Sequence, residues 1–488
     1  MAKRITAISL TLAMAVAAEG DVRHDDWHRV TTPDFEMLSD LAPPDALALA
    51  DRLTRFRIAA QSLLGQQELS GPAPRMIAFR SARAFRQVFA LRNISGVTLS
   101  SISRYTLAFG PDGLRGYDSG ALTAFHEYSH YLMQNNRQMN YPAWWEEGYA
   151  NFLSTMYAQD DGVVVGHVPP IRRRQMVRSR PSLKDLFDDR IVFDWKRRDL
   201  EGVYLKAWLL VHMLQLGHLS GLPPFHERVP EMLAKIDAGE STRVAVETSL
   251  SMDLPALERT LNAYIRRISL PTHTLVVDVE HETPMDVQPL AVPEVRHALA
   301  NAAAAAGNLR HAARLFQEVL DDDPDDIDAL VGLSSTTQDP DHSLEAAERA
   351  LALDAEHPGA NVRMAELNVT RCSQATRDEC LAVWRESAEF YRRAVRNDPD
   401  NVDAAFGLGV IYLHVGQPGD AMGYLRVAHG RAPWVPRINL FLGEAYRLTG
   451  DVERARAHLT KAMHWHRDLR WRERAVLALS MMESGDDG

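Results

Sequence analysis

Two histidines four residues apart, with a glutamate beside the first, are the residues of this chain best suited to chemistry. They are His126 and His130 in the stretch AFHEYSHYL, and the glutamate is Glu127. Residues four apart on a helix share one face, so both imidazoles can reach one metal ion. Glu127 then lies beside the ligands, where it can act as general base on a metal-bound water. The pattern is short, and two surface histidines on a helix are the alternative.

A third ligand is available seventeen residues after His130. Glu147 lies in YPAWWEEGYANFL, where Pro142 suits the first turn of a second helix. Gly148 removes a side chain where two helices must come close to share an ion. Glu146 is the competing candidate, but it lies about 100° away around the helix. Two histidines and one carboxylate are a usual ligand set for a catalytic zinc, with one position left open for water.

These residues resemble the gluzincin metallopeptidases, the group that includes thermolysin and aminopeptidase N. The resemblance rests on HEYSH and WWEEGYA. It implies Zn²⁺ bound by His126, His130 and Glu147, with Glu127 as base and proton shuttle. The stretch GVYLKAWLLVHML is similar to a region of those enzymes whose tyrosine hydrogen-bonds the oxyanion, which implies this role for Tyr204. A tyrosine packed on an amphipathic helix is the alternative for that residue.

The chain is more similar still to the bacterial peptidase MA-like group, over about residues 27 to 270. The segment that anchors the substrate amine in aminopeptidases is missing, and SRYTLAFGPDG takes its place. An edge strand there could pair with an extended substrate, which favours an endopeptidase. The acidic residue that usually supports the ligands is not evident, since Asn151 and Ser154 follow Glu147.

Mixed helices and strands are predicted around these residues. Helical spacing of apolar residues marks PPDALALADRLTRFRIAAQSLLG, and Ser81 opens a short helix in SARAFRQVFA. APRMIAFR and SRYTLAFG are predicted strands, and WHRVTTPDFEMLSD has a partial strand pattern. From Ser119 to about Arg267 the pattern is mostly helical, with a β-like interruption at GVVVGHV. The expected fold is an α+β zincin-like metallopeptidase domain.

The last third of the chain repeats itself. Gly416 and Gly450 are 34 residues apart, and each is followed five residues later by an alanine, Ala421 or Ala455. This period and these small residues resemble the tetratricopeptide repeat, a helix-turn-helix unit. About five repeats are expected, closed by a capping helix at RWRERAVLALSMM, and they form an all-α solenoid. The predicted domains are therefore a signal peptide at 1–18, the peptidase domain at 19–270, a linker at 271–292 and the solenoid at 293–488. The stretch LPTHTLVVDVEHETPMDVQPLAVPEV before the solenoid is predicted to be a strand followed by a linker.

The first residues have the pattern of a signal peptide. Lys3 and Arg4 precede an apolar run from Ile5 to Ala17, which is shorter than the roughly 20 residues of a membrane span. Cleavage is expected after Ala17 or Ala18, so the protein is expected to be exported, periplasmic or secreted. An uncleaved anchor or a buried terminal helix is the alternative. No later span is expected, because the apolar stretch YLKAWLLVHMLQLGHL contains a lysine and a histidine.

Composition narrows the possible partners. The 488 residues are 46% hydrophobic and 24% charged, values ordinary for a globular protein, and the net charge of −11 argues against nucleic acid. Cys372 and Cys380 are eight positions apart, and they form either a local disulfide or two inert thiols.

Three functions fit the sequence. The first is an exported zinc endopeptidase whose repeats recruit a protein substrate or partner in their groove. The second is a repeat-based interaction or assembly factor with a non-catalytic zinc domain. The third is a zinc hydrolase that acts on something other than peptide.

Overall fold

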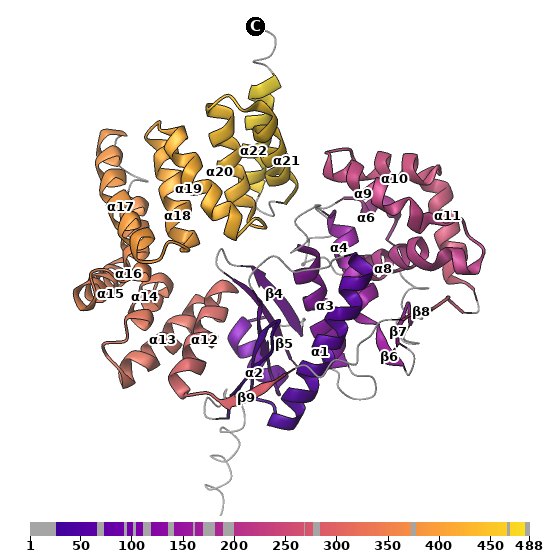
Figure 1. Ribbon diagram of the computed structural model, residues 1–488, viewed down its shortest axis with the longest axis horizontal. Coiled ribbons are helices and arrows are strands. Elements are labelled where there is room, and N and C mark those ends of the chain that lie inside the picture. The colour runs from indigo at the N-terminus through magenta and orange to yellow at the C-terminus, as the bar shows by residue number, and fades with distance from the viewer. Residues whose placement is uncertain are drawn as a thin grey trace, which may run out of the picture.

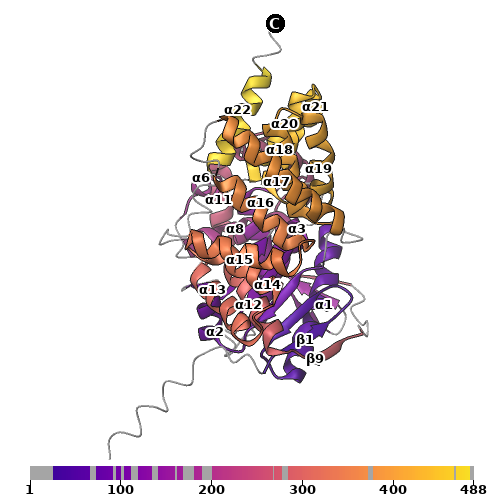
Figure 2. The same ribbon diagram turned by 90° about the vertical axis from the view of Figure 1, so that its left-hand side faces the viewer.

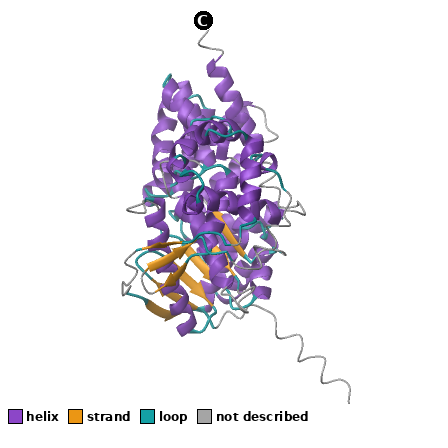
Figure 3. Ribbon diagram, turned by 90° about the vertical axis from the view of Figure 1, so that its right-hand side faces the viewer, coloured by secondary structure: helices purple, strands orange, loops and turns teal. Residues whose placement is uncertain are grey.

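The computed structural model describes two parts of the chain, a sheet-bearing N-terminal part and a C-terminal row of helices (Figure 1). Strands gather at one end of the molecule, and helices make up most of the rest (Figure 3). The described residues are 26–65, 73–91, 95–100, 104–110, 119–134, 141–159, 162–168, 181–188, 200–267, 269–276, 284–371, 377–465 and 469–483.

The main sheet contains six described strands in the order β4-β5-β3-β2-β1-β9. The pairs β2–β3 and β3–β5 are parallel, and the other pairs are antiparallel. The strands are β1 (His28–Thr31), β2 (Glu36–Ser39), β3 (Arg75–Ala78), β4 (Gly96–Ser100), β5 (Tyr105–Phe109) and β9 (Asp286–Pro289). The strands predicted at APRMIAFR and SRYTLAFG are confirmed as β3 and β5, and WHRVTTPDFEMLSD forms the pair β1 and β2.

The helices of the N-terminal part, within the described residues, are α1 (Pro43–Leu64), α2 (Ala82–Phe89), α3 (Ser119–Gln134), α4 (Ala143–Ser154), α6 (Leu183–Leu186), α8 (Leu200–Leu216), α9 (Val229–Asp237), α10 (Thr242–Leu250) and α11 (Leu254–Ile265). The helices α1 and α3 pack on this sheet, and α4 and α8 continue the packing outward from α3. Ser81 caps α2 as predicted, by accepting hydrogen bonds from the first backbone N–H groups of that helix. A second sheet is formed by β6 (Tyr157–Gln159), β7 (Gly162–Val165) and β8 (His273–Leu275), and β7 is the predicted GVVVGHV segment.

Both faces of the main sheet are buried, because successive residues of a strand point to opposite faces. Met76 of β3 belongs to the core that contains residues of α1 and α3. The next residue, Ile77, belongs to a second core with residues of α2 and of the first C-terminal helices. The sheet is thus enclosed between the helix α3 on one face and the start of the repeats on the other.

The C-terminal helices form five pairs and a final single helix within the described residues. The helices are α12 (Val292–Ala305), α13 (Leu309–Asp322), α14 (Ile327–Thr336), α15 (Pro340–Leu353), α16 (Pro358–Arg371), α17 (Arg377–Asn397), α18 (Val402–His414), α19 (Pro418–Arg431), α20 (Pro436–Leu448), α21 (Val452–Trp465) and α22 (Leu469–Glu483). They follow one another from α12 in the lower part of Figure 2 to α22 at its top, and Figure 1 shows that their row is curved. This arrangement matches the predicted solenoid.

Glycines at a spacing of 34 residues let the two helices of a pair approach. A Cβ on Gly409 would lie 2.5 Å from Leu425, and a Cβ on Gly443 would lie 2.8 Å from Leu459. Each contact joins the first helix of a repeat to its second helix. The same small residue therefore recurs because the same close crossing recurs.

The described parts of the predicted linker at residues 271–292 include two strands. Within this range β8 pairs with β7, and β9 pairs with β1 at the border of the main sheet. The Asn308 side-chain amide then donates hydrogen bonds of 3.1 and 2.8 Å to the backbone carbonyls of Gln87 and Val88 in α2. The first strand, β8, lies where the sequence predicts a strand at the start of this stretch. The second, β9, was not predicted, because it is short and largely exposed and lacks the apolar alternation by which a sequence reveals a strand.

The predicted edge strand is also misplaced by one strand. β5 lies between β3 and β4, and Tyr105, Leu107 and Phe109 are buried there. The border strand next to α3 is β4, which precedes β5 in the chain.

The solenoid touches the N-terminal part a second time near its far end. Trp434, between α19 and α20, has its ring centroid 4.8 Å from that of Tyr105 in β5. Tyr105 in turn packs edge-on against Tyr131 of α3 at 5.2 Å. The first repeat therefore packs on the sheet, and a residue near the far end of the repeats reaches α3 through the ring of Tyr105.

Several predictions concern residues outside the described part of the chain. They are the signal peptide at 1–18 and Cys372 of the possible disulfide; Cys380 is buried on α17. Within the described residues, no helix combines the length and the apolar character needed to cross a bilayer.

Candidate metal centre

The helix α3 places both predicted histidines on one face. The Nε2 atoms of His126 and His130 lie 3.2 Å apart, as expected for residues four apart on a helix. The neighbouring face of α3 packs on α1, where Phe125 stacks on Phe56 at 4.2 Å and Tyr128 is fully buried. This packing fixes the rotation of α3 and thereby directs the two imidazoles toward α4.

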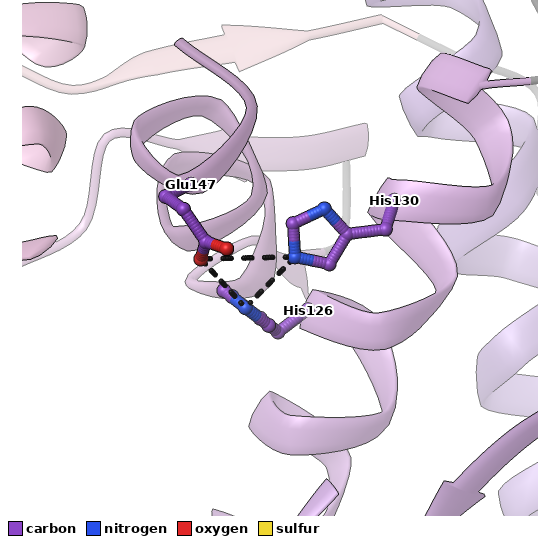
Figure 4. Close-up of side chains that lie close together, drawn as sticks. All are labelled: His126, His130 and Glu147. Atoms are coloured by element: carbon purple, nitrogen blue, oxygen red, sulfur yellow. Dashed lines mark hydrogen bonds and ion pairs between the residues drawn. The ribbon is translucent and has the colours of Figure 1, made fainter. Parts of the chain in front are cut away.

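The helix α4 supplies the third predicted ligand. The Oε2 atom of Glu147 lies 3.5 Å from the Nε2 atom of His126 and 3.7 Å from that of His130 (Figure 4). Pro142 is the cap of α4 rather than part of its first turn. A Cβ on Gly148 would lie 2.7 Å from the backbone oxygen of Ala207, so this glycine permits a close crossing with α8 and not with α3 as predicted.

The geometry of these three residues fits a zinc ion. A tetrahedral zinc with ligands at about 2.0–2.1 Å requires neighbouring ligand atoms to lie about 3.3 Å apart. The three observed separations of 3.2, 3.5 and 3.7 Å surround that value. Among the described residues, this is the one group of three or more potential ligands whose donor atoms converge. Three lone-pair donors that point at one place form an arrangement that a cation stabilises.

The side chains are partly shielded but still accessible. Their exposed fractions are 20% for His126, 10% for His130 and 12% for Glu147. A centre with three protein ligands and access from solvent has the form of a catalytic zinc site, whereas structural sites are closed by a fourth protein ligand.

Glu127 is held by a residue that the sequence did not reveal. The hydroxyl of Thr98, on the border strand β4, lies 2.6 Å from Oε2 of Glu127 and donates a hydrogen bond to it. Gly96 makes room for the same carboxylate, because a Cβ there would lie 2.9 Å from Oε1 of Glu127 and 2.4 Å from Thr123. The predicted base is therefore fixed against a strand border rather than free on the helix surface.

Tyr204 lies on α8, one turn before the contact between α8 and α4. Ala207 and Val211 of α8 meet Gly148, and Tyr204 shares their helical face because it is three residues from Ala207. Tyr204 is half-buried and packs on the core that contains the site helices. Its role with the oxyanion stays a prediction. The competing ligand Glu146 does not belong to the converging group. Burial raises the pKa of Tyr105, and the negative charge of Glu146 raises it further.

The residues around α4 and α8 are mostly structural. Asn151 donates a hydrogen bond of 2.8 Å to the backbone oxygen of Glu147, and so supports the ligand's helix with an amide in place of the expected acid. His212 is fully buried, with its two ring nitrogens 3.0 Å from the Tyr264 hydroxyl and 3.0 Å from the Gly166 carbonyl. Burial lowers the pKa of His212 to about 4, so this imidazole is neutral at pH 7.

Comparison with known proteins identifies the C-terminal region. The family model described as tetratricopeptide repeat matches residues 384–433, which include all of α18 and α19. The C-terminal region carries tetratricopeptide repeats. No curated protein matches the chain.

Several solved structures of repeat proteins are similar to this region in fold. A thermophilic TPR protein of Thermus thermophilus is 24% identical, with a TM-score of 0.33 over 38% of this chain and 99% of that chain. PilF of Pseudomonas aeruginosa is 17% identical, with a TM-score of 0.32 over 40% of this chain and 86% of that chain.

Proposed function

We propose that this protein is a zinc-dependent peptidase whose tetratricopeptide repeats bind a protein substrate or partner. The observation that carries the proposal is the convergence of His126, His130 and Glu147, with Glu127, the residue after His126, hydrogen-bonded to Thr98. A purely structural metal site has no need of a positioned base next to an accessible side. The proposal includes a zincin-like fold for the N-terminal part of the chain.

The chemistry follows from the positions of the side chains. Zinc bound by these three residues would supply Lewis acidity, which polarises a carbonyl and makes a water more acidic. Glu127 takes the proton of the attacking water and delivers it to the leaving amine. The hydroxyl of Thr98 donates to Oε2 of Glu127 and so orients the carboxylate that would accept the proton. Tyr204 is proposed to donate a hydrogen bond to the oxyanion.

The border strand β4 offers a path for an extended substrate. No strand of the described residues pairs with its outer side. Because Thr98 of β4 contacts Glu127, a peptide that pairs with the outer side of β4 would lie one strand away from the general base. Such binding uses backbone groups and needs no free amino terminus, which favours an endopeptidase.

A second candidate function is supported by the comparisons. They match the repeats alone, and so support protein binding more directly than hydrolysis. In this alternative the chain is an interaction or assembly factor, and its zinc domain is non-catalytic. A zinc hydrolase for another substrate is the third possibility.

Metal analysis combined with digestion of an unfolded protein substrate tests the proposal. We expect one zinc per chain and zinc-dependent cleavage of reduced casein by the wild-type protein. Glu127→Gln should keep the zinc and abolish cleavage, whereas His130→Ala and Glu147→Ala should lose both. Cleavage by Glu127→Gln at the wild-type rate would contradict the mechanism. Full zinc occupancy without any cleavage, together with retained partner binding, would favour the assembly factor.

A further inference from the structure

Arg437 carries a positive charge at a position where its surroundings stabilise that charge poorly. It is the second residue of α20, and the positive end of the helix dipole disfavours a cation in the first turn. Other repeat helices have an acidic residue in this turn, such as Asp403 in α18 and Glu453 in α21.

The surroundings of Arg437 add a second cost to its charge. Its guanidinium lies 5.5 Å from the ring centroid of Phe406 and 4.9 Å from that of Trp471. Although the residue as a whole is exposed, the rings remove water from the guanidinium, and this burial lowers its pKa.

A second arginine in the same stack shows the difference that an ion pair makes. Arg474 lies 4.7 Å from the ring centroid of Phe441 and 5.8 Å from that of Trp471. Its Nε and Nη2 atoms each lie 2.7 Å from an oxygen of the Glu444 carboxylate, which is a two-pronged ion pair. In the described part of the chain, no carboxylate forms an ion pair with Arg437; Glu366 acts on it electrostatically without such a contact. Both arginines therefore stack on Trp471, but only Arg474 also forms an ion pair with a carboxylate.

Arg437 lies on the surface built by α16, α18, α20 and α22, the first helices of successive repeats and the final helix, which we call the repeat face. It belongs there because it contacts residues of both α18 and α22. It is also three residues after Trp434, whose ring meets Tyr105 of β5 at 4.8 Å. Tyr105 packs on Tyr131, the residue after His130. Arg437 thus marks the part of the repeat face that adjoins the metal-site helix.

We propose that Arg437 binds an aspartate or glutamate side chain of an extended protein segment, and that it thereby selects the substrates delivered to the metal centre. A guanidinium fixed between aromatic faces keeps its N–H edge in one plane, the geometry that a carboxylate accepts through two parallel hydrogen bonds. The delivery step rests on the proposed peptidase function; the binding step does not.

Two features of the repeat face define the segment further. Arg437 is exposed on an open surface, so a bound chain can continue past it in both directions, which suits a side chain better than a chain end. Glu366 of α16 is paired with Arg363 at 3.1 Å, and Asp403 of α18 adds a second carboxylate near it; burial, followed by the charge of Glu366, raises the pKa of Asp403 to about 6. These carboxylates disfavour a run of acidic residues in the bound segment, so a single acidic residue fits best.

The test measures binding without cleavage. The full-length chain with Glu127→Gln is incubated with pools of N-acetylated, C-amidated decapeptides, each with one position fixed as Glu, Gln or Lys, and retained peptides are quantified. We expect Glu pools to be retained at least about tenfold over Gln pools, since a hydrogen-bonded charge pair contributes about 1.5–3 kcal/mol. Adding Arg437→Gln should abolish this preference, and Arg437→Lys should keep part of it.

Arg474→Gln is the matched control. It changes an arginine of the same stack that already has a carboxylate, so it should lower the melting temperature and leave the Glu preference intact. Arg437→Gln should leave the melting temperature unchanged or raised, because it removes a cation from a helix N-terminus.

Three outcomes would overturn the inference. They are equal retention of Glu and Gln pools, a Glu preference that survives Arg437→Gln, and retention that depends only on a free C-terminal carboxylate in a parallel pool. The peptidase proposal fails separately, if wild-type protein with zinc leaves casein intact.

Discussion

At the scale of single residues, the candidate site combines groups that the sequence reveals with groups that it conceals. His126 and His130 were predictable because a spacing of four on a helix determines their common face. Glu147 was predictable because few residue types complete such a ligand set. Thr98 and Gly96 were not, because a threonine or a glycine in a short strand carries no chemical signal. Their function depends on the contact between β4 and α3, which is about thirty residues further along the chain.

Thr98 should act as a positioning residue for the general base. Thr98→Val removes the donor at 2.6 Å while keeping the shape of the side chain. The loss of a hydrogen bond to a charged group costs about 1.5–3 kcal/mol, so kcat should fall by about ten- to a hundredfold with little change in KM. Zinc content should be unchanged.

Thr98→Ser is the control for this prediction, because it restores the hydroxyl and should restore most of kcat. Equal kcat values for the valine variant and the wild type would show that Glu127 does not need this contact.

At the scale of elements, the approach of α4 to α8 determines where Glu147 lies. Gly148→Ala would place a Cβ 2.7 Å from the backbone oxygen of Ala207 in α8. A backbone atom cannot rotate away as the end of a flexible side chain can. The helices must separate, at a cost of about 1–3 kcal/mol, and zinc affinity should fall with thermal stability. Calorimetry of zinc binding and a thermal melt measure both effects.

Gly423→Ala is the matched substitution. Gly423 lies within α19 with no atom near its added Cβ, so alanine should stabilise the helix by about 0.5–1 kcal/mol. Equal changes in thermal stability and zinc affinity for the two variants would show that the close crossing of α4 and α8 does not depend on Gly148.

The buried imidazole of α8 makes the stability of this region depend on pH. His212 has a pKa of about 4 in the folded protein and an ordinary value of 6.5 when unfolded. Between these values the unfolded chain binds the proton and the folded chain does not, so stability falls as pH decreases from about 6.5 to 4. The full effect is about 3 kcal/mol, given about 1.4 kcal/mol per pKa unit.

Melting temperatures measured from pH 8 to pH 5 test this expectation. His212→Gln should flatten part of the decline, and the remainder is expected from His458, whose pKa burial also lowers to about 4. An unchanged slope in the variant would remove His212 as a cause.

At the scale of the whole molecule, the sequence predicted the two parts but not the way in which they join. The solenoid was predictable because each repeat uses the same local contacts, such as Gly409 with Leu425 and Gly443 with Leu459. The boundary was not, because β9 is short and exposed and pairs with β1, more than 250 residues earlier. Apolar periodicity records local burial and does not record which distant surface an element covers.

The first repeat should therefore be required for the N-terminal part to fold. A fragment that ends at residue 270 lacks β9 and uncovers the face of the sheet that holds Leu38, Ile77 and Phe79. Each such side chain contributes about 1.5–3 kcal/mol when buried, against a total stability of about 5–15 kcal/mol. This fragment should show no cooperative thermal transition and should bind little zinc. A fragment that ends at residue 323, after α13, keeps β9 and covers this face with α12 and α13, and it should melt cooperatively and bind one zinc. Cooperative melting and stoichiometric zinc in the shorter fragment would mean that the solenoid is an attachment to the metal domain rather than a part of its core.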